Sequence, residues 1–246
     1  MLISVLHNIG GTYRRGFELF SLAPLIVALA VIPEFIQHVA EIYLGMFDNI
    51  DRARALADDP TRWAFGYVKV AGVILTIFAS ARFWGVRSTG RTWWRFGDVA
   101  LQRFVVAFAL FMLVPFLSKP LYPHLSPATA AALDVFLAVA SLPFLLPALG
   151  GLFGDREIDL REGHRRWRAF PLLIILLVAG YGPAFLVHMG LHKLAMGAPL
   201  SVVWLLMAGD ALVVGLLASL TGAALALGYR AAFPSLPDQP AAGSTT

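Results

Sequence analysis

The sequence predicts an all-α polytopic membrane protein, a bundle of about six transmembrane helices. Apolar residues make up 59% of the 246 positions, charged residues only 14%, and the mean hydropathy is +0.74. A soluble domain is closer to half apolar and about a quarter charged, because its surface must be polar, whereas a surface that faces lipid must not be. None of the apolar stretches alternates with period two, so a membrane β-barrel is not predicted.

Six apolar stretches reach the length of roughly 20 residues that a helix needs to cross a bilayer. They lie at 17–37, 63–84, 99–117, 127–153, 170–191 and 201–227, and together form one predicted transmembrane domain, 1–233. Prolines in the fourth stretch leave five or seven spans open, if that stretch is re-entrant or split. Residues 1–16 are predicted to form a short interfacial segment, and the Pro/Ser/Gly-rich end, 234–246, to be disordered.

Basic residues are distributed unevenly between the two sides of this topology. Thirteen lie on one side: Arg14, Arg15, Arg82, Arg87, Arg91, Arg95, Arg103, Arg156, Arg161, Arg165, Arg166, Arg168 and Arg230. Five lie on the other: Arg52, Arg54, Arg62, Lys119 and Lys193. The side richer in Lys and Arg faces the cytoplasm. We therefore expect a bacterial inner-membrane protein with both the N-terminus and the C-terminus in the cytoplasm.

Composition also excludes several kinds of chemistry. Cysteine is absent, which excludes disulfides, thiolate metal sites and cysteine nucleophiles. The basic pI of about 9.7 reflects topogenic charges in short loops, so no nucleic-acid partner is expected. The expected partners are membrane lipids and a membrane protein or a second copy of the chain. No phosphate loop, nucleophile elbow or redox motif is present, so no catalytic or cofactor-binding residue is predicted.

A short motif, Pro-x-Phe-x-x-His, occurs near the ends of spans one and five, as Pro33, Phe35, His38 and as Pro183, Phe185, His188. Span three ends in LVPFLSKP, which keeps the proline and a phenylalanine. Basic and aromatic residues precede each odd span, for example Tyr13-Arg14-Arg15. These repeated features predict three tandem helical hairpins whose connecting loops lie on the outer side of the membrane.

The pattern of three such hairpins resembles a broad group of bacterial six-span inner-membrane proteins. That group includes the YciC-like proteins and the membrane domain attached to some glycerophosphodiester phosphodiesterases. The resemblance implies a membrane-embedded helical bundle and supplies no catalytic residue.

The outer ends of spans one and five carry a candidate metal site. Glu34, His38 and Glu41 share one helical face, and His188 and His192 stand one turn apart. Imidazole and carboxylate are suitable ligands for Zn, Fe or Mn, and bundles often combine ligands from neighbouring helices. The alternative is that these side chains bind no metal and lie at helix ends in the interface, in contact with water and lipid headgroups. No zincin spacing is present, so the pattern does not indicate a hydrolase.

Three further ionisable residues lie within the spans: Lys69, Asp134 and Asp210. Each costs ~2.5–3.5 kcal/mol to insert, so such residues usually face a partner or water. Their distances from the cytoplasmic ends place all three near the level of Glu34. We expect Lys69 to pair with a carboxylate, either as a structural ion pair or as part of a proton or ion relay.

Two functional hypotheses follow. The first is a non-enzymatic membrane protein with a role in transport, lipid handling or assembly, since no catalytic motif is present. The second is a metal-dependent membrane enzyme, or a metal- or proton-handling protein, that uses the outer His/Glu cluster.

Overall fold

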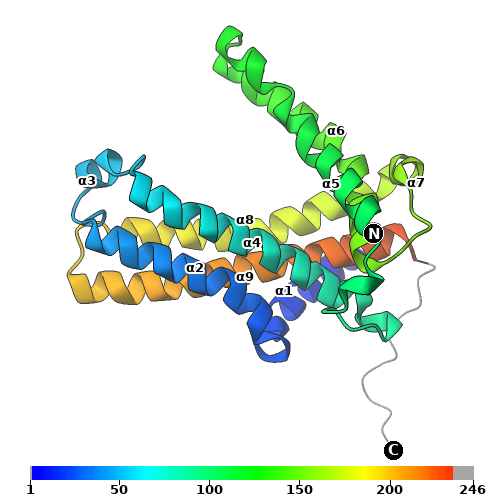
Figure 1. The fold of residues 1–246 in the computed structure, drawn as a ribbon, viewed down its shortest axis with the longest axis horizontal. Coiled ribbons are helices and arrows are strands. Elements are labelled where there is room, and N and C mark those ends of the chain that lie inside the picture. The colour runs from blue at the N-terminus through cyan, green and yellow to red at the C-terminus, as the bar shows by residue number, and fades with distance from the viewer. Residues whose placement is uncertain (1, 235–246) are drawn as a thin grey trace, which may run out of the picture. The chain divides into compact units, whose positions relative to one another are not determined.

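The computed structural model describes residues 2–234 and confirms the all-α prediction, because no strand occurs within that range (Figure 1). Six helical segments are long and apolar enough to cross a membrane, so the chain is an integral membrane protein. They are built on α2 (Pro24–Tyr43), α4 (Pro60–Val86), α5 (Leu101–Phe116), α6 (Pro127–Phe153), α8 (Phe170–Ala195) and α9 (Leu200–Ala232). From residue 235 onward, the predicted disordered tail lies outside the described residues.

Other helical segments precede and connect these six. They are α1 (Leu2–Leu22), α3 (Ile50–Ala55), α7 (Leu160–Arg165) and four 3₁₀ turns, Arg87–Thr89, Phe96–Asp98, Lys119–His124 and Trp167–Ala169. Asp159 caps α7: its Oδ1 accepts a hydrogen bond from the backbone N–H of Glu162 at 2.9 Å. This bond holds the pKa of Asp159 below its ordinary value.

The predicted first span, 17–37, is wrong at both ends. One helix ends at Leu22 and the next begins at Pro24, so the apolar helix runs to Tyr43. The break occurs because Ala23 has a non-helical conformation (φ −149°, ψ 62°) and Pro24 occupies the first helical position. A proline is suited to that position, since its missing N–H would be unsatisfied there in any case. The short interfacial segment expected at 1–16 is instead part of the longer α1.

The other spans agree with the prediction to within a few residues at each end, and α6 covers the same residues as predicted. Despite Pro143 and Pro147, α6 is one continuous helix, so the alternative of a split or re-entrant fourth stretch is wrong. Ser126 caps its first turn by accepting a hydrogen bond from Thr129 N–H, and Gly154, with φ +81°, ends it.

The chain packs as two compact units. Among the described residues, the first contains Leu2–Trp84 together with Ile175–Leu225, and the second contains Gly85–Ile174 and Ala226–Pro234. In the first unit α2, α4, α8 and α9 lie side by side (Figure 1). In the second unit α5 and α6 pack against each other, and α7 packs on α6.

Helices α2 and α4 approach each other closely at Gly72. Pro33 donates no hydrogen bond to the carbonyl of Leu29 one turn before it, and Gly72 lies against that carbonyl oxygen. A side chain at Gly72 would collide with Leu29 O and with the Pro33 ring. One turn further on, Thr76 Oγ1 donates to Ile26 O at 3.0 Å. These contacts fix the two helices at the short separation on which the candidate site depends.

The loops that follow α2 and α8 meet at one end of the first unit. Gly197 N–H donates to Phe47 O at 2.8 Å. Phe47 packs in a cluster with Ala195, Val203 and Met207. The first and the last hairpin of the chain are therefore joined at their connecting loops.

Candidate metal centre

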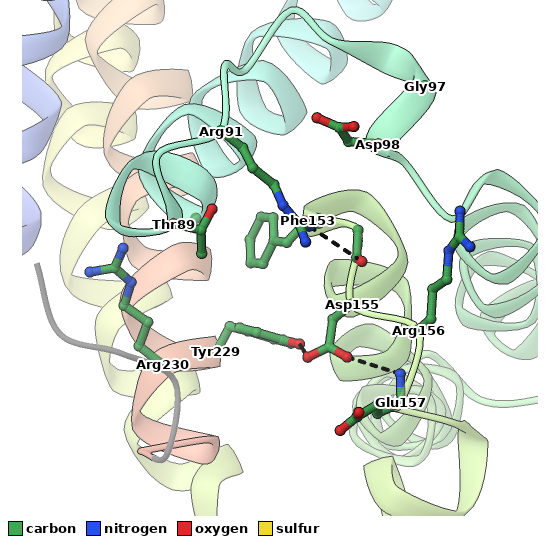
Figure 2. A pocket seen from close by; sticks show the side chains of 12 residues that line it. Thr89, Arg91, Gly97, Asp98, Phe153, Asp155, Arg156, Glu157, Tyr229 and Arg230 are labelled. Carbon is green, nitrogen blue, oxygen red and sulfur yellow. Dashed lines mark hydrogen bonds between the residues drawn. The ribbon is translucent and has the colours of Figure 1, made fainter.

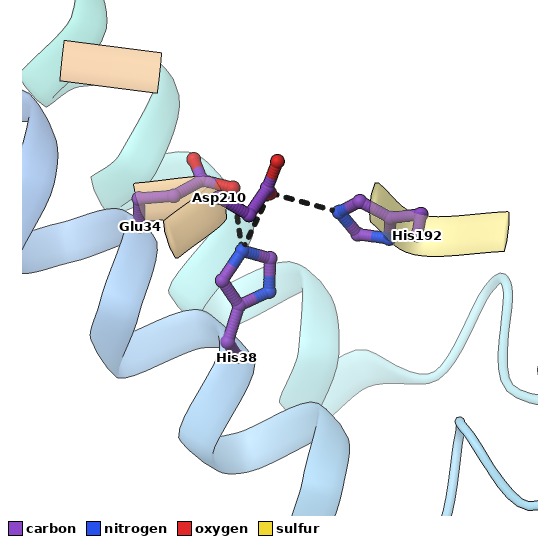
Figure 3. A group of neighbouring side chains, drawn as sticks. All are labelled: Glu34, His38, His192 and Asp210. Carbon is purple, nitrogen blue, oxygen red and sulfur yellow. Dashed lines mark hydrogen bonds and ion pairs between the residues drawn. The ribbon is translucent and has the colours of Figure 1, made fainter. Parts of the chain in front are cut away.

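Three histidines converge on Asp210, a fully buried carboxylate in α9, and Figure 3 shows two of them, His38 and His192. His38 Nε2, from α2, lies 2.9 Å from Asp210 Oδ2. From α8, His188 Nδ1 lies 2.8 Å and His192 Nε2 3.2 Å from the same oxygen. Two helices, α2 and α8, thus direct three imidazole nitrogens at one carboxylate oxygen of a third helix, α9.

Glu34 lies one turn before His38 and extends the cluster. Its Oε1 is 3.1 Å from His38 Nε2 and 2.8 Å from Lys69 Nζ, so the expected pair between Lys69 and a carboxylate is present. Both Glu34 oxygens are buried, yet neither accepts a well-aligned hydrogen bond. A buried carboxylate without hydrogen bonds is costly unless a cation lies close to it.

Glu41 supports His38 from the opposite side of the ring. Its Oε2 lies 3.0 Å from His38 Nδ1, while its Oε1 accepts hydrogen bonds from Gln37 Nε2 at 3.0 Å and Arg62 Nε at 2.9 Å. A neutral imidazole has one N–H and one lone pair. If Nδ1–H donates to Glu41, the lone pair of Nε2 faces Glu34 and Asp210. Metal-binding histidines typically have this carboxylate partner on their second nitrogen.

Burial distinguishes this cluster from polar helix ends at a wet interface. Glu34, His38 and Asp210 have no exposed surface, and Glu41 is 1% exposed. The alternative interpretation of solvated side chains is therefore wrong for these residues. The His188 and His192 side chains, in contrast, keep 14% and 21% of their surface exposed.

Four side chains could together hold a metal ion and are called the ligand set below: Glu34, His38, His192 and Asp210. One potential ligand atom from each lies within 4.8 Å of the others. A metal with bonds of ~2.0–2.2 Å places its ligand atoms about 3–3.5 Å apart, so a small inward movement would complete the site. Two carboxylates and two imidazoles without sulfur fit the divalent ions Zn²⁺, Fe²⁺ and Mn²⁺.

The residues singled out in the sequence divide into three groups. Glu34, His38 and His192 belong to the ligand set, and Glu41 and His188 hold His38 and Asp210 in place. The sequence marks Asp210 only as an intramembrane charge, whereas the structure places it at the centre of the cluster. Asp134 does not join: it is exposed in the second unit, where the Tyr122 hydroxyl donates a hydrogen bond to it.

The second unit has a polar cavity of about 610 Å³ (Figure 2). Tyr229 donates a hydrogen bond to Asp155 at 3.1 Å, and Arg91 donates one to Phe153 O at 3.3 Å. The charged residues around the cavity are Arg91, Arg156, Arg230, Asp98, Asp155 and Glu157. Because acidic and basic groups are equal in number, the lining does not select a ligand of either charge. The His cluster is therefore the better-defined candidate site.

Comparison of the chain with protein families, with curated proteins and with solved structures yields no match. Fold and site together define an integral membrane protein with a buried cluster of carboxylates and histidines.

Proposed function

We propose that this protein is a metal-handling membrane protein that binds one divalent first-row transition metal through Glu34, His38, His192 and Asp210. The observation that carries the proposal is the convergence of three imidazole nitrogens on Asp210 Oδ2, beside a buried Glu34 that accepts no well-aligned hydrogen bond. Such a cluster matches the donor types that Zn²⁺, Fe²⁺ and Mn²⁺ prefer.

The hydrogen-bond count favours a metal over a purely structural network or a proton relay. Without a metal, His38 must carry two N–H groups to serve Glu41 on one side and Asp210 on the other, while Glu34 has the Lys69 ammonium beside Oε1 and no partner at Oε2. With a metal, neutral His38 keeps its bond to Glu41 through Nδ1 and offers the Nε2 lone pair to the ion. The ion would also supply positive charge to Asp210 and to Glu34, in addition to the Lys69 ammonium that lies 2.8 Å from Glu34 Oε1.

Metal analysis of the protein purified in detergent tests this proposal. After incubation with Zn²⁺, Mn²⁺ or Fe²⁺ and removal of free metal, we expect the wild type to retain about one ion per chain. His38→Ala and His192→Ala should each lose at least about tenfold in affinity, because removal of a ligand weakens a site strongly. His164→Ala, in the second unit, is the matched control and should bind as the wild type does.

A wild type that retains none of the three metals would refute the proposal. So would equal retention by His38→Ala, His192→Ala and the control, since the metal would then bind elsewhere. The thermal unfolding of each variant shows whether a loss of metal reflects the ligand or the fold.

We also propose that the protein resides in a bacterial inner membrane with both chain ends in the cytoplasm. The support is the excess of thirteen basic residues over five on the opposite side. The metal site then lies nearer the outer surface. Reporters fused within residues 53–59 and after Thr246 should report opposite sides, and a C-terminal reporter outside the cytoplasm would overturn this orientation.

A further inference from the structure

We infer that Lys69 is a tethered cation that competes with the metal for Glu34, which makes the metal exchangeable instead of permanently bound. This inference rests on the proposed function. It assigns to Lys69 a role in setting the affinity of the site, although Lys69 is not a ligand.

The geometry places Lys69 in direct competition for a ligand atom. Lys69 Nζ lies 2.8 Å from Glu34 Oε1, and His38 Nε2 lies 3.1 Å from the same oxygen. Among the described residues, Glu34 is the carboxylate that lies within ion-pair distance of Lys69. The close contact of Gly72 with α2, less than one turn after Lys69, holds α4 where the ammonium reaches Glu34.

The balance of charge explains why the two cations exclude each other. Glu41 is neutralised by Arg62, whose Nε lies 2.9 Å from Oε1. The remaining carboxylates, Glu34 and Asp210, together carry two negative charges, which one divalent ion neutralises. When the metal is bound, Lys69 has no carboxylate left to balance its charge, and the two cations repel each other at short distance.

The Lys69 side chain is also free to move away from Glu34 when the metal enters. Its side chain is 23% exposed, whereas Glu34 is fully buried. A lysine ammonium sits on a flexible four-carbon stem and can move toward water while the stem stays packed. Lys69 can therefore make way for a metal by a rotation of its own side chain, and release of the metal is assisted when the ammonium returns to Glu34.

The test compares metal affinity in the purified full-length wild type, Lys69→Met, Lys69→Arg and Lys119→Met. Lys69→Met keeps the length of the side chain and removes its charge. It should bind Zn²⁺ or Mn²⁺ at least about tenfold more tightly, and release it more slowly to a chelator, since a repelling charge is gone. Lys69→Arg retains the charge and should stay near the wild type. Lys119→Met, in the second unit, controls for loss of a lysine charge elsewhere.

Unchanged or weaker binding by Lys69→Met would overturn the inference, because Lys69 would then only position Glu34. If neither the wild type nor Lys69→Met binds a metal, the proposed function itself fails, so the two failures are distinguishable.

A second measurement uses the wild type alone and does not depend on the folding of a variant. Reductive methylation followed by mass spectrometry should show faster modification of Lys69 when Zn²⁺ is bound, because the ammonium has left Glu34. Lys119 should react equally with and without metal. Equal reactivity of Lys69 in both states would contradict displacement.

Discussion

The two units of the chain differ in how deeply they bury the charged side chains of their apolar helices. In the first unit, Glu34, His38 and Asp210 are completely buried and point at one another from different helices. In the second unit, Asp134 is exposed on α6 and accepts a hydrogen bond from the hydroxyl of Tyr122. Charge is thus buried only where several helices supply partners, as expected where an isolated buried charge is costly.

The apolar helices differ in the same way. Helix α2 buries seven residues, and four of them, Glu34, Gln37, His38 and Glu41, are polar. Helix α5 buries one, Ala107, and exposes large apolar side chains such as Val105, Met112 and Leu113. An exposed apolar surface is suited to lipid, whereas a buried polar face requires a specific partner. The comparison supports the choice of the first unit for the proposed metal site.

Removal of Asp210 should have the largest effect on stability. Asp210→Ala leaves three histidines without their shared acceptor and should destabilise the protein by about 3–5 kcal/mol. Asp134→Ala removes an exposed carboxylate and should cost less than about 1 kcal/mol. Thermal or denaturant unfolding in detergent measures both. Similar losses for the two variants would contradict the distinction between a buried network and an exposed charge.

A smaller effect is expected at Gly72, where α4 touches α2. Gly72→Ala places a methyl group against Leu29 O and the Pro33 ring, and should destabilise by about 1–3 kcal/mol. Gly182→Ala is the matched control in α8, where no described atom lies within 4 Å of the added methyl. It should be neutral or stabilise by up to ~1 kcal/mol through helix propensity. Equal stability of the two variants would show that the close approach at Gly72 is not required.

The sequence predicts the helices and half of the site. Lengths of apolar stretches give the six spans, and helical periodicity places Glu34, His38 and Glu41 on one face, which the structure buries. The role of Asp210 is not predictable in this way, since periodicity does not tell which helix packs against α2 and α8. The helix boundary at Pro24 is missed because the same proline can occupy a first turn or a helix interior.

X-ray absorption spectroscopy of the metal-loaded wild type tests the central claim most directly, because it reports the atoms bound to the ion. We expect nitrogen and oxygen ligands at ~2.0–2.2 Å, with the scattering pattern of two imidazoles from His38 and His192. His38→Ala should lose part of the imidazole signal, and His164→Ala should not. A shell of oxygen atoms without imidazole in the wild type would show that the metal does not bind at the cluster, and would contradict the account.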